Sequence, residues 1–565
     1  MDYVGIGKKK TELDKDYIFG RWGPYQTLQA AFVFFHTWET GFQLLVGVFI
    51  AYRPGFQCAT PYFDNISLSN DSSYVLYGKC QIKVFHNDTD GPKLDSVREC
   101  TSDYKYTLDK EKTIVTEFDL VCDNSNLAEF LQTLVMAGQL VGAVCASSLS
   151  DRVGRKTVHL CSNLLTLIFG ISVAFAPNYT TLAILKFILG VLQQGMVMSA
   201  AVFTVELFPE KTRYLSKLTG SFMFTTGLVL MSAIAYLLRS YPWRYLQITL
   251  SCFSLLSLIQ YWVQDESLKW LIANGKTKEI KRILRKVSKW NKLDYGELFA
   301  NVNQKMNVSN MEKPLNAELQ LRNNKTAISV EKYSILTILQ NRSLLWITLL
   351  MGFVWITNTL TYFGLLLTAT SLAGNHFFNF FLSACVEYIS FILEVFMLYR
   401  FGRRTALMFF HCITGTSLAL ATLLNYFSDG DETLILLSVI ATFAGKMSVT
   451  GSFSTLFLFT PELYPTNLRN VGIGICSTFS RIGAMISPFV GILASHVPWA
   501  PGTIFVSMCF IVIIIALYLP ETRGMDLLQS LGEVKIWYAG NIGFRLKKGR
   551  KKNKSTPEIL VHCDS

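Results

Sequence analysis

Long apolar runs, separated by polar segments, dominate the chain. Each run is about 20 residues long, which is the length at which an α-helix crosses the hydrocarbon core of a bilayer. We expect each run to form a membrane-spanning helix, so the pattern predicts an all-α membrane protein. The expected spans are residues 26–50, 129–150, 157–176, 181–203, 218–239, 244–264, 344–367, 377–398, 405–426, 434–458, 470–491 and 501–519.

The polar segments divide the 12 expected spans into two groups of six. The resulting parts are a first half at 1–264 that includes a polar insertion at 52–126, a linker at 265–343, a second half at 344–519 and a basic tail at 520–565. Within the linker, apolar residues recur at helical spacing between Lys and Arg residues. Ile280, Ile283, Leu284 and Val287 therefore predict an amphipathic helix that packs on the inner face of the protein or on lipid.

Composition and charge agree with a membrane protein. Of the 565 residues 51% are hydrophobic and only 16% are charged, whereas soluble domains carry about 25% charged residues. The net charge of +12 is concentrated in 151–156, the linker and the tail, which lie on one side of a protein with 12 spans. Basic loops mark the cytoplasmic side, so we expect both termini in the cytoplasm and the protein in the plasma membrane. The bilayer is then the partner of the basic residues, because no nucleic-acid-binding fold accompanies them.

The polar insertion at 52–126 carries the signs of an oxidising compartment. It holds four cysteines, which allow two disulfides in three possible pairings. It also contains three N-glycosylation sequons, but sequons begin at Asn307, Asn324 and Asn341 of the linker as well, so the cysteines and the charge bias decide the side. The cysteines are Cys58, Cys80, Cys100 and Cys122, and the sequons of the insertion begin at Asn65, Asn70 and Asn87.

Three short motifs of the first half recur in the second. Residues 206–209 (Glu-Leu-Phe-Pro) recur at 462–465 (Glu-Leu-Tyr-Pro), 153–156 recur at 401–404, and 265–267 recur at 520–522. The offsets of 256, 248 and 255 residues nearly agree, and each motif falls at the same end of a corresponding span. These matches predict two related halves of six helices each.

The same residues resemble a known family. Asp151-Arg152-Val153-Gly154-Arg155-Lys156 resembles the loop signature of the major facilitator superfamily. The cysteine-containing insertion, the segment around 462–469 and Pro520-Glu521-Thr522 resemble the organic cation/anion/zwitterion transporter family, over essentially the whole chain. Ser147 and residues 265–270 depart from the usual pattern without removing its charges. The resemblance implies the major facilitator fold and secondary transport of small organic ions, with no cofactor and a monomer as the transport unit.

Charged residues at the cytoplasmic ends of the expected helices are candidate gating residues. Two halves that rock about a central site need interactions that hold one face closed and then release it, and ion pairs between Arg and Glu meet that need. The alternative is that these charges only orient the helices. The candidates are Asp151, Arg152, Arg155, Glu206, Arg213, Arg403, Glu462 and Arg469, together with Lys446 inside the tenth span.

Charges near the centre of the expected spans are candidates for the substrate site, because ionisable groups at that depth usually face a cavity or a partner. Arg481 offers a planar fork to a carboxylate. The resemblance places it where anion and zwitterion carriers have Arg and cation carriers have Asp. A bound carboxylate or chloride is one interpretation, and a structural pair with Glu387 or Glu394 is the other.

Two acidic residues point toward a cationic group or a proton instead. Glu39 is expected to bind an ammonium, to carry a coupling proton or to pair with Lys446, whereas Glu387 is either a ligand or a structural residue. The driving ion stays open among sodium, protons and chloride, with facilitated transport as a further alternative. An organic cation carrier that uses Glu39 and Glu387 is therefore the second hypothesis for the function.

Aromatic residues complete the candidate site. The resemblance places Trp355, Tyr362 and Phe363 at cavity-lining positions of the seventh span, and an aromatic wall binds cationic groups through cation–π attraction. Phe391 stands where the organic-anion branch often has Lys and where carnitine-type carriers have an aromatic residue. Arg481 with these aromatics and acids favours a zwitterion or a small organic anion.

The chain lacks the motifs of the main competing functions. We find no P-loop, dinucleotide-binding glycine pattern, zinc spacing or nucleophile elbow, so an ATP-driven pump and an enzyme are both disfavoured. A membrane receptor that keeps the fold without transporting is the remaining alternative of a different class. It predicts binding without flux.

Overall fold

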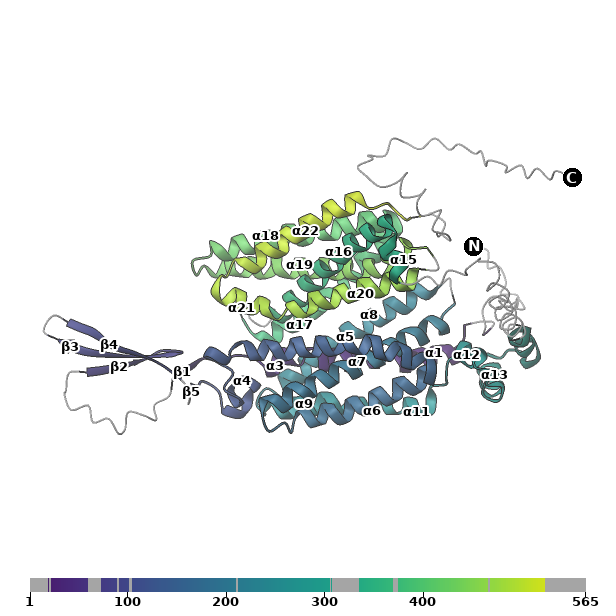
Figure 1. Cartoon of the computed structure of the whole chain (residues 1–565), viewed down its shortest axis with the longest axis horizontal. Helices are drawn as coiled ribbons and strands as arrows, with labels where there is room; N and C mark the ends of the chain where they lie inside the picture. Colours follow the sequence, from purple (N-terminus) through teal and green to yellow (C-terminus); the bar gives the residue numbers. More distant parts are fainter. Residues whose placement is uncertain are drawn as a thin grey trace, which may run out of the picture.

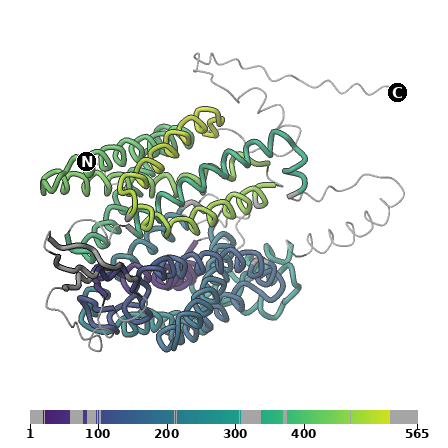
Figure 2. The backbone as a smooth tube through the Cα atoms, turned by 60° about the vertical axis from the view of Figure 1, so that its left-hand side comes forward, coloured from purple at the N-terminus to yellow at the C-terminus, as the bar shows by residue number. Residues whose placement is uncertain are grey.

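The membrane-spanning helices form two groups that lie side by side, one from each half of the chain (Figures 1 and 2). The computed structural model describes residues 19, 22–58, 73–88, 91–100, 104–209, 212–304, 306, 335–368, 374–465 and 468–523. Within these ranges 11 helical segments are long and apolar enough to cross a membrane. A twelfth, in the predicted span 470–491, is divided into two helices.

The first half contains spans one to six. Its first and sixth spans are each built from three consecutive helices, and the others are single helices. The elements are α1 (Pro24–Phe34), α2 (His36–Leu45), α3 (Gly47–Ile50), α5 (Asn126–Val153), α6 (Arg155–Val173), α7 (Tyr179–Leu207), α8 (Arg213–Leu237), α9 (Trp243–Cys252), α10 (Ser254–Leu258) and α11 (Gln260–Val263). The helix α7 begins where the Asn178 side chain accepts a hydrogen bond from the Thr181 amide, a common N-cap.

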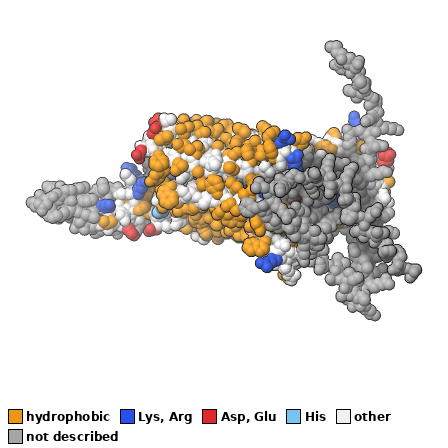
Figure 3. Space-filling model, turned by 90° about the horizontal axis from the view of Figure 1, so that it is seen from above, with side chains coloured by type: hydrophobic (Ala, Val, Ile, Leu, Met, Phe, Trp, Pro, Cys, Tyr) orange, Lys and Arg blue, Asp and Glu red, His pale blue; other side chains and the backbone are white. Residues whose placement is uncertain are grey.

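The second half repeats this plan after a short helix, α15. Its elements are α15 (Ile335–Gln340), α16 (Arg342–Thr368), α17 (His376–Arg400), α18 (Arg403–Tyr426), α19 (Glu432–Glu462), α20 (Arg469–Ile486), α21 (Phe489–His496) and α22 (Ala500–Tyr518). The halves meet where α5 packs on α20 and where α8 packs on α17. A belt of hydrophobic side chains covers the middle of the bundle face in Figure 3, and acidic and basic side chains lie toward its two ends. This distribution is what a bilayer requires of a spanning protein.

The predicted span 470–491 is present as α20 and α21, and Ser487 and Pro488 between them keep helical backbone angles although the hydrogen-bond ladder is interrupted there. Pro488 has no amide hydrogen to donate to the carbonyl of Ala484, one turn earlier, so the helix is interrupted between α20 and α21. The Ser487 hydroxyl donates to that same carbonyl at 2.8 Å. A neighbouring side chain thus supplies the hydrogen bond that proline cannot make.

The cysteine-containing insertion projects beyond one end of the bundle, which we call the cysteine side (Figure 1). The sequence analysis did not predict its strands, which pair antiparallel in the orders β1–β5 and β2–β3–β4. The elements are β1 (Phe56–Cys58), β2 (Ser73–Tyr77), β3 (Gln81–Asp88), β4 (Gly91–Glu99), β5 (Tyr104–Tyr106), the short helix α4 (Ile114–Glu117) and the 3-10 turns Lys110–Lys112 and Cys122–Asn124.

Two disulfides, Cys58–Cys100 and Cys80–Cys122, connect this insertion internally, and they select one of the three possible pairings. At its base Glu117 accepts hydrogen bonds from the side chains of Trp243 and Arg244 in α9. Tyr106 donates to Asp119 at 2.9 Å, and its burial together with this carboxylate raises the pKa of the Tyr106 hydroxyl. Of the three sequons, Asn87 lies in β3, and Asn65 and Asn70 lie outside the described residues.

The linker helices lie at the opposite end of the bundle, which we call the linker side (Figure 1). They are α12 (Leu268–Ala273) and α13 (Thr277–Asn291). The predicted amphipathic helix is confirmed, because Ile280, Ile283, Leu284 and Val287 are all buried on one face of α13. They pack against α1 and the end of α7 rather than on lipid.

Candidate functional site

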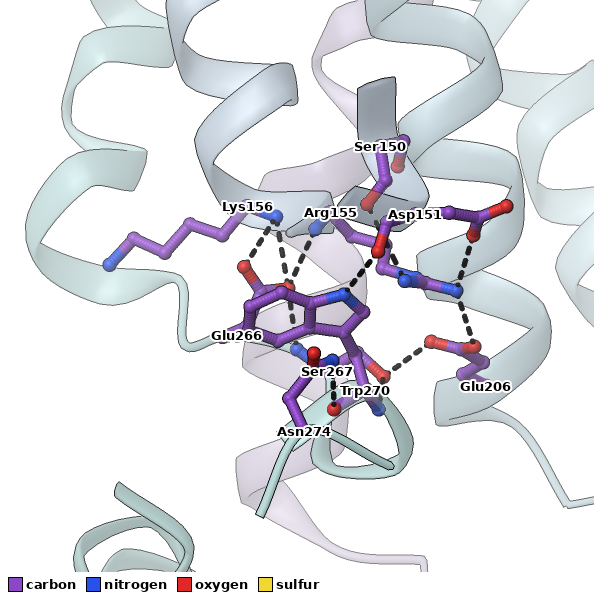
Figure 4. Close-up of polar contacts among 9 residues, drawn as sticks. All are labelled: Ser150, Asp151, Arg155, Lys156, Glu206, Glu266, Ser267, Trp270 and Asn274. Atoms are coloured by element: carbon purple, nitrogen blue, oxygen red, sulfur yellow. Dashed lines mark hydrogen bonds and ion pairs between the residues drawn. The ribbon is translucent and has the colours of Figure 1, made fainter. Parts of the chain in front are cut away.

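On the linker side, the motifs of the first half form one connected network (Figure 4). The Glu266 carboxylate accepts hydrogen bonds from the amides of Arg155 and Lys156 at 2.9 and 3.1 Å, so it caps the start of α6. The Arg155 guanidinium lies 2.9 Å from Asp151 and 3.6 Å from Glu206. Three motifs that are far apart in sequence therefore meet around Arg155.

The second half repeats these contacts. The amide of Arg403 donates to Glu521 at 3.0 Å, and its guanidinium pairs with Glu462 at 3.0 Å. Thr522 donates to the second oxygen of Glu462 at 2.5 Å. The internal sequence repeat is therefore also a repeat of the same capping and ion-pair geometry.

These networks differ from a gate that joins the two halves. Each ion pair described on the linker side lies within one half. Arg469 donates to the carbonyl of Pro461 at 2.9 Å instead of pairing with Glu462. Arg152 is exposed and has no acidic partner among the described residues, and the side chain of Arg213 lies outside them. A gating role for these residues stays a prediction.

In the middle of the second half, Lys446 and Glu387 form a fully buried ion pair at 3.1 Å. Tyr362 donates to one Glu387 oxygen at 2.9 Å, and Thr225 of α8 donates to the other at 2.8 Å. The alternative pairing of Lys446 with Glu39 is wrong, because α17 and α19 pack together and bring Glu387 to the lysine. Both Glu387 oxygens are thus engaged, one of them by the opposite half.

Glu39 lies buried within the first half instead. It is 1% exposed on α2, and Ser257 of α10 donates a hydrogen bond to it. No cation forms an ion pair with it within the described ranges. A buried carboxylate of this kind is a functional candidate by the cost of its burial.

Arg481 has no acidic partner among the described residues. It lies on α20, where its guanidinium donates to the carbonyl and hydroxyl of Ser477 at 2.8 and 2.7 Å. Its Nε is buried without a hydrogen-bond partner. Neither Glu387 nor Glu394 pairs with it, so the structural alternative is wrong in this conformation. One turn further on, the Met485 carbonyl accepts a hydrogen bond from Thr133 of α5, which places this end of α20 against the first half.

The predicted aromatic residues occupy two kinds of environment. Trp355 is 1% exposed and donates to Thr460 at 3.0 Å, and Tyr362 stacks on Phe453. Both therefore pack between α16 and α19 in this conformation. Phe363 contacts Tyr362 edge to face, and Phe391 is half-buried.

The sequence analysis missed two residues of α8 that contact the second half, Lys217 near the linker-side end of the helix and Thr225 two turns further on. Lys217 of α8 places its Nζ 3.7 Å from the ring centre of Phe457 in α19. It stands one residue before the expected span 218–239, so it was not counted as an intramembrane charge. Thr225 gave no signal, because a neutral hydroxyl is common in membrane helices.

Aromatic contacts join the halves on the cysteine side. Tyr52 stacks on His376 with ring centres 4.9 Å apart, and Phe49 lies 5.5 Å from Phe377 and 5.0 Å from Phe380. These residues come from the end of the first span and the start of α17. The halves are therefore in direct contact at this end of the bundle.

The repeated six-helix halves, the apolar belt and the charges between helices define a polytopic membrane transporter. The family model for sugar (and other) transporters matches residues 94–530. The chain belongs to this family, and within the major facilitator superfamily it belongs to the organic ion transporters, which are not enzymes.

Curated relatives support this assignment, and solved structures show the same fold. The chain is 30% identical to an organic cation transporter protein of Drosophila melanogaster, over 91% of this chain and 92% of that one. It is 29% identical to organic anion transporter 3 of Oryctolagus cuniculus, over 92% of both chains. The fold is similar to that of the xylose transporter XylE from E. coli in a partially occluded inward open conformation, with a TM-score of 0.58 and 13% identity over 89% of this chain and all of that one.

Proposed function

We propose that the chain carries small organic anions or zwitterions, of a carnitine-like kind, across the plasma membrane by alternating access. In this proposal the cysteine side is extracellular and the termini are cytoplasmic. The disulfides and the basic linker support that orientation.

The unpaired guanidinium of Arg481 carries this proposal. The other central cation of the second half, Lys446, is already neutralised by Glu387. Arg481 has only neutral partners in Ser477 and keeps a buried N–H group without an acceptor. A carboxylate that binds between the halves gives this guanidinium the bidentate acceptor that it lacks. The proposed preference for an anionic group follows from this uncompensated positive charge.

The test is uptake in cells that express the protein. Arg481→Ala removes the cation, and Arg481→Lys keeps a charge without the planar fork. We expect uptake of anionic and zwitterionic probes to fall at least tenfold in Arg481→Ala and to recover only partly in Arg481→Lys. Arg239→Ala is the control, because Arg239 lies on the cysteine side and contacts its own Tyr236. Undiminished anion uptake by Arg481→Ala, at equal surface expression, contradicts the proposal.

A cation carrier is the second candidate, and Glu39 is the observation that favours it. This buried carboxylate has no cationic partner in the described part of the chain. Glu387 is a weaker candidate for binding a cationic substrate, because its two oxygens already contact Lys446, Tyr362 and Thr225. If Glu39→Gln abolishes uptake of cationic probes while Arg481→Ala leaves it intact, the cation reading replaces ours. Accumulation in proteoliposomes separates either carrier from a receptor that binds without flux.

A further inference from the structure

A cavity of about 290 Å³ lies on the cysteine side, between the two halves. Its volume is near the lower end of the range for small-molecule pockets, roughly 300–1,000 Å³. Residues of the first, second and fourth spans line it, together with Leu367, Pro488 and Gly491 of the second half. It is lined by residues of α21 and the first two turns of α5, and not by Arg481, Tyr362 or Glu387. It is therefore separate from the candidate substrate site.

Lys186 of α7 lines this cavity and has no acidic partner. It is 4% exposed, and its one recorded contact is with the Gln247 side-chain oxygen at a long 3.4 Å. The side-chain nitrogen of Gln247 donates a hydrogen bond to Gln43 at 2.9 Å, which orients the Gln247 amide so that its oxygen is available to Lys186. No carboxylate pairs with Lys186 in the described ranges. An amide oxygen does not neutralise a buried ammonium, so its charge remains uncompensated.

In the second half, the corresponding buried lysine has a negative charge of the chain beside it. Lys446 occupies the tenth span, the repeat of the fourth, and Glu387 neutralises it at 3.1 Å. In the first half, the lysine in the fourth span borders open space instead of an acidic side chain. The comparison indicates that the missing negative charge is supplied from outside the chain.

The other charges of the lining leave this excess in place. Arg53 and Glu129 form an ion pair at 2.6 Å, and Arg53 also donates to the Ser125 carbonyl at 2.5 Å. The pair is neutral as a unit, so the lining carries one net positive charge from Lys186. We propose that this cavity is a binding site for a small monovalent anion, either a halide or the carboxylate of a small organic acid, with Lys186 as its main ligand.

The position of the site connects the anion to the transport cycle. Because both halves line the cavity, an opening of the cysteine side separates its walls. An anion that binds only the closed arrangement stabilises that arrangement. The bound anion therefore slows the opening of this side and makes transport depend on anion concentration. This effect does not require that the substrate itself is an anion.

Thermal unfolding of the purified full-length chain tests the site directly. The protein is titrated with chloride, and separately with formate, against gluconate at constant ionic strength. We expect a saturable rise of Tm for the wild type, because a ligand of the folded state stabilises it. The stronger of the two titrations identifies the source of the anion. A wild type whose Tm responds to neither anion overturns the proposal.

Two variants assign the response to this cavity. Lys186→Gln removes the charge, and Gly491→Leu adds a bulky side chain to the lining, where a Cβ at Gly491 meets no atom within 4 Å. We expect each variant to raise the anion concentration needed for half-saturation at least tenfold. If Lys186→Gln does not fold, the anion response of Gly491→Leu alone tests whether the anion binds in this cavity. A wild-type response in Gly491→Leu overturns the assignment.

Two controls separate this site from the rest of the chain. Lys112→Gln removes a lysine that bonds the Ser240 carbonyl on the cysteine side outside the cavity, and it should keep the full response. Arg481→Ala should keep it as well, so a failure of the proposed substrate site leaves this test unaffected. Loss of the response in Arg481→Ala, with retention in Lys186→Gln, places the anion at Arg481 and contradicts our inference.

Discussion

Three cationic side chains inside the bundle have different surroundings. Lys446 is neutralised by Glu387, Lys186 faces a cavity, and Arg481 is held by the neutral groups of Ser477. Burying a charge is costly unless it is paired. The charge of Lys446 is thus compensated within the chain, and the other two are the positions at which we propose that the protein accepts a negative charge from outside.

The buried Lys446–Glu387 pair gives a prediction about stability. Lys446→Met leaves Glu387 buried and uncompensated, which costs about 3–5 kcal/mol. Lys446→Met combined with Glu387→Gln removes both charges, so we expect most of that stability to return. Thermal unfolding monitored by size-exclusion chromatography measures both variants.

A control for this pair is Lys278→Met, which alters an exposed lysine of α13. It should change stability much less than Lys446→Met. If the double variant is as unstable as Lys446→Met alone, the pair is not the source of the loss. Glu387 would then have a second role that the described contacts do not explain.

At the scale of elements, each half contains one tight turn between consecutive helices at a corresponding position, α5 to α6 in the first half and α17 to α18 in the second. Gly154 and Gly402 adopt φ values of +112° and +107°, which side chains rarely permit. A Cβ at these positions would lie 2.4 Å from a Glu266 oxygen and 2.8 Å from a Glu521 oxygen. Glycine is therefore required twice at these positions: it adopts the positive φ of the turn, and it leaves space for the carboxylate that caps the next helix.

This geometry predicts that Gly402→Ala is destabilising by at least about 1–3 kcal/mol, because the backbone is strained and Glu521 must move. Gly474→Ala is the matched control, because a Cβ there meets no atom within 4 Å in the interior of α20. It should be neutral or stabilising by about 0.5–1 kcal/mol. Equal melting temperatures for the two variants would contradict the explanation.

Elements governed by local pattern were predictable from the sequence, and those governed by long-range contacts were not. The spans and the buried face of α13 follow from runs and spacing of apolar residues. Pro488 was expected inside its span because membrane helices tolerate proline, and the structure keeps helical backbone angles there while it loses one hydrogen bond of the ladder. Whether Glu387 or Glu39 reaches Lys446 depends on how the helices rotate and pack, which one sequence does not encode locally.

At the scale of the whole molecule, the two halves are related by repeated contacts but are held together unequally at their two ends. On the linker side the described ion pairs stay within a half. On the cysteine side, Tyr52 and Phe49 of the first half stack on α17. The aromatic stacking between the halves indicates that the structure represents a state in which the cysteine side is closed.

The closed contact gives the final prediction, about the transport cycle. Tyr52 and His376 face each other across the halves with ring centres 4.9 Å apart, so Tyr52→Cys with His376→Cys brings two thiols within reach of a short bifunctional thiol reagent. Alternating access requires this contact to break in every cycle. We expect cross-linking to reduce uptake at least tenfold and a reductant to restore it. Each single variant treated with the same reagent controls for the native cysteines. Undiminished uptake by fully cross-linked protein would mean that this end does not open during transport.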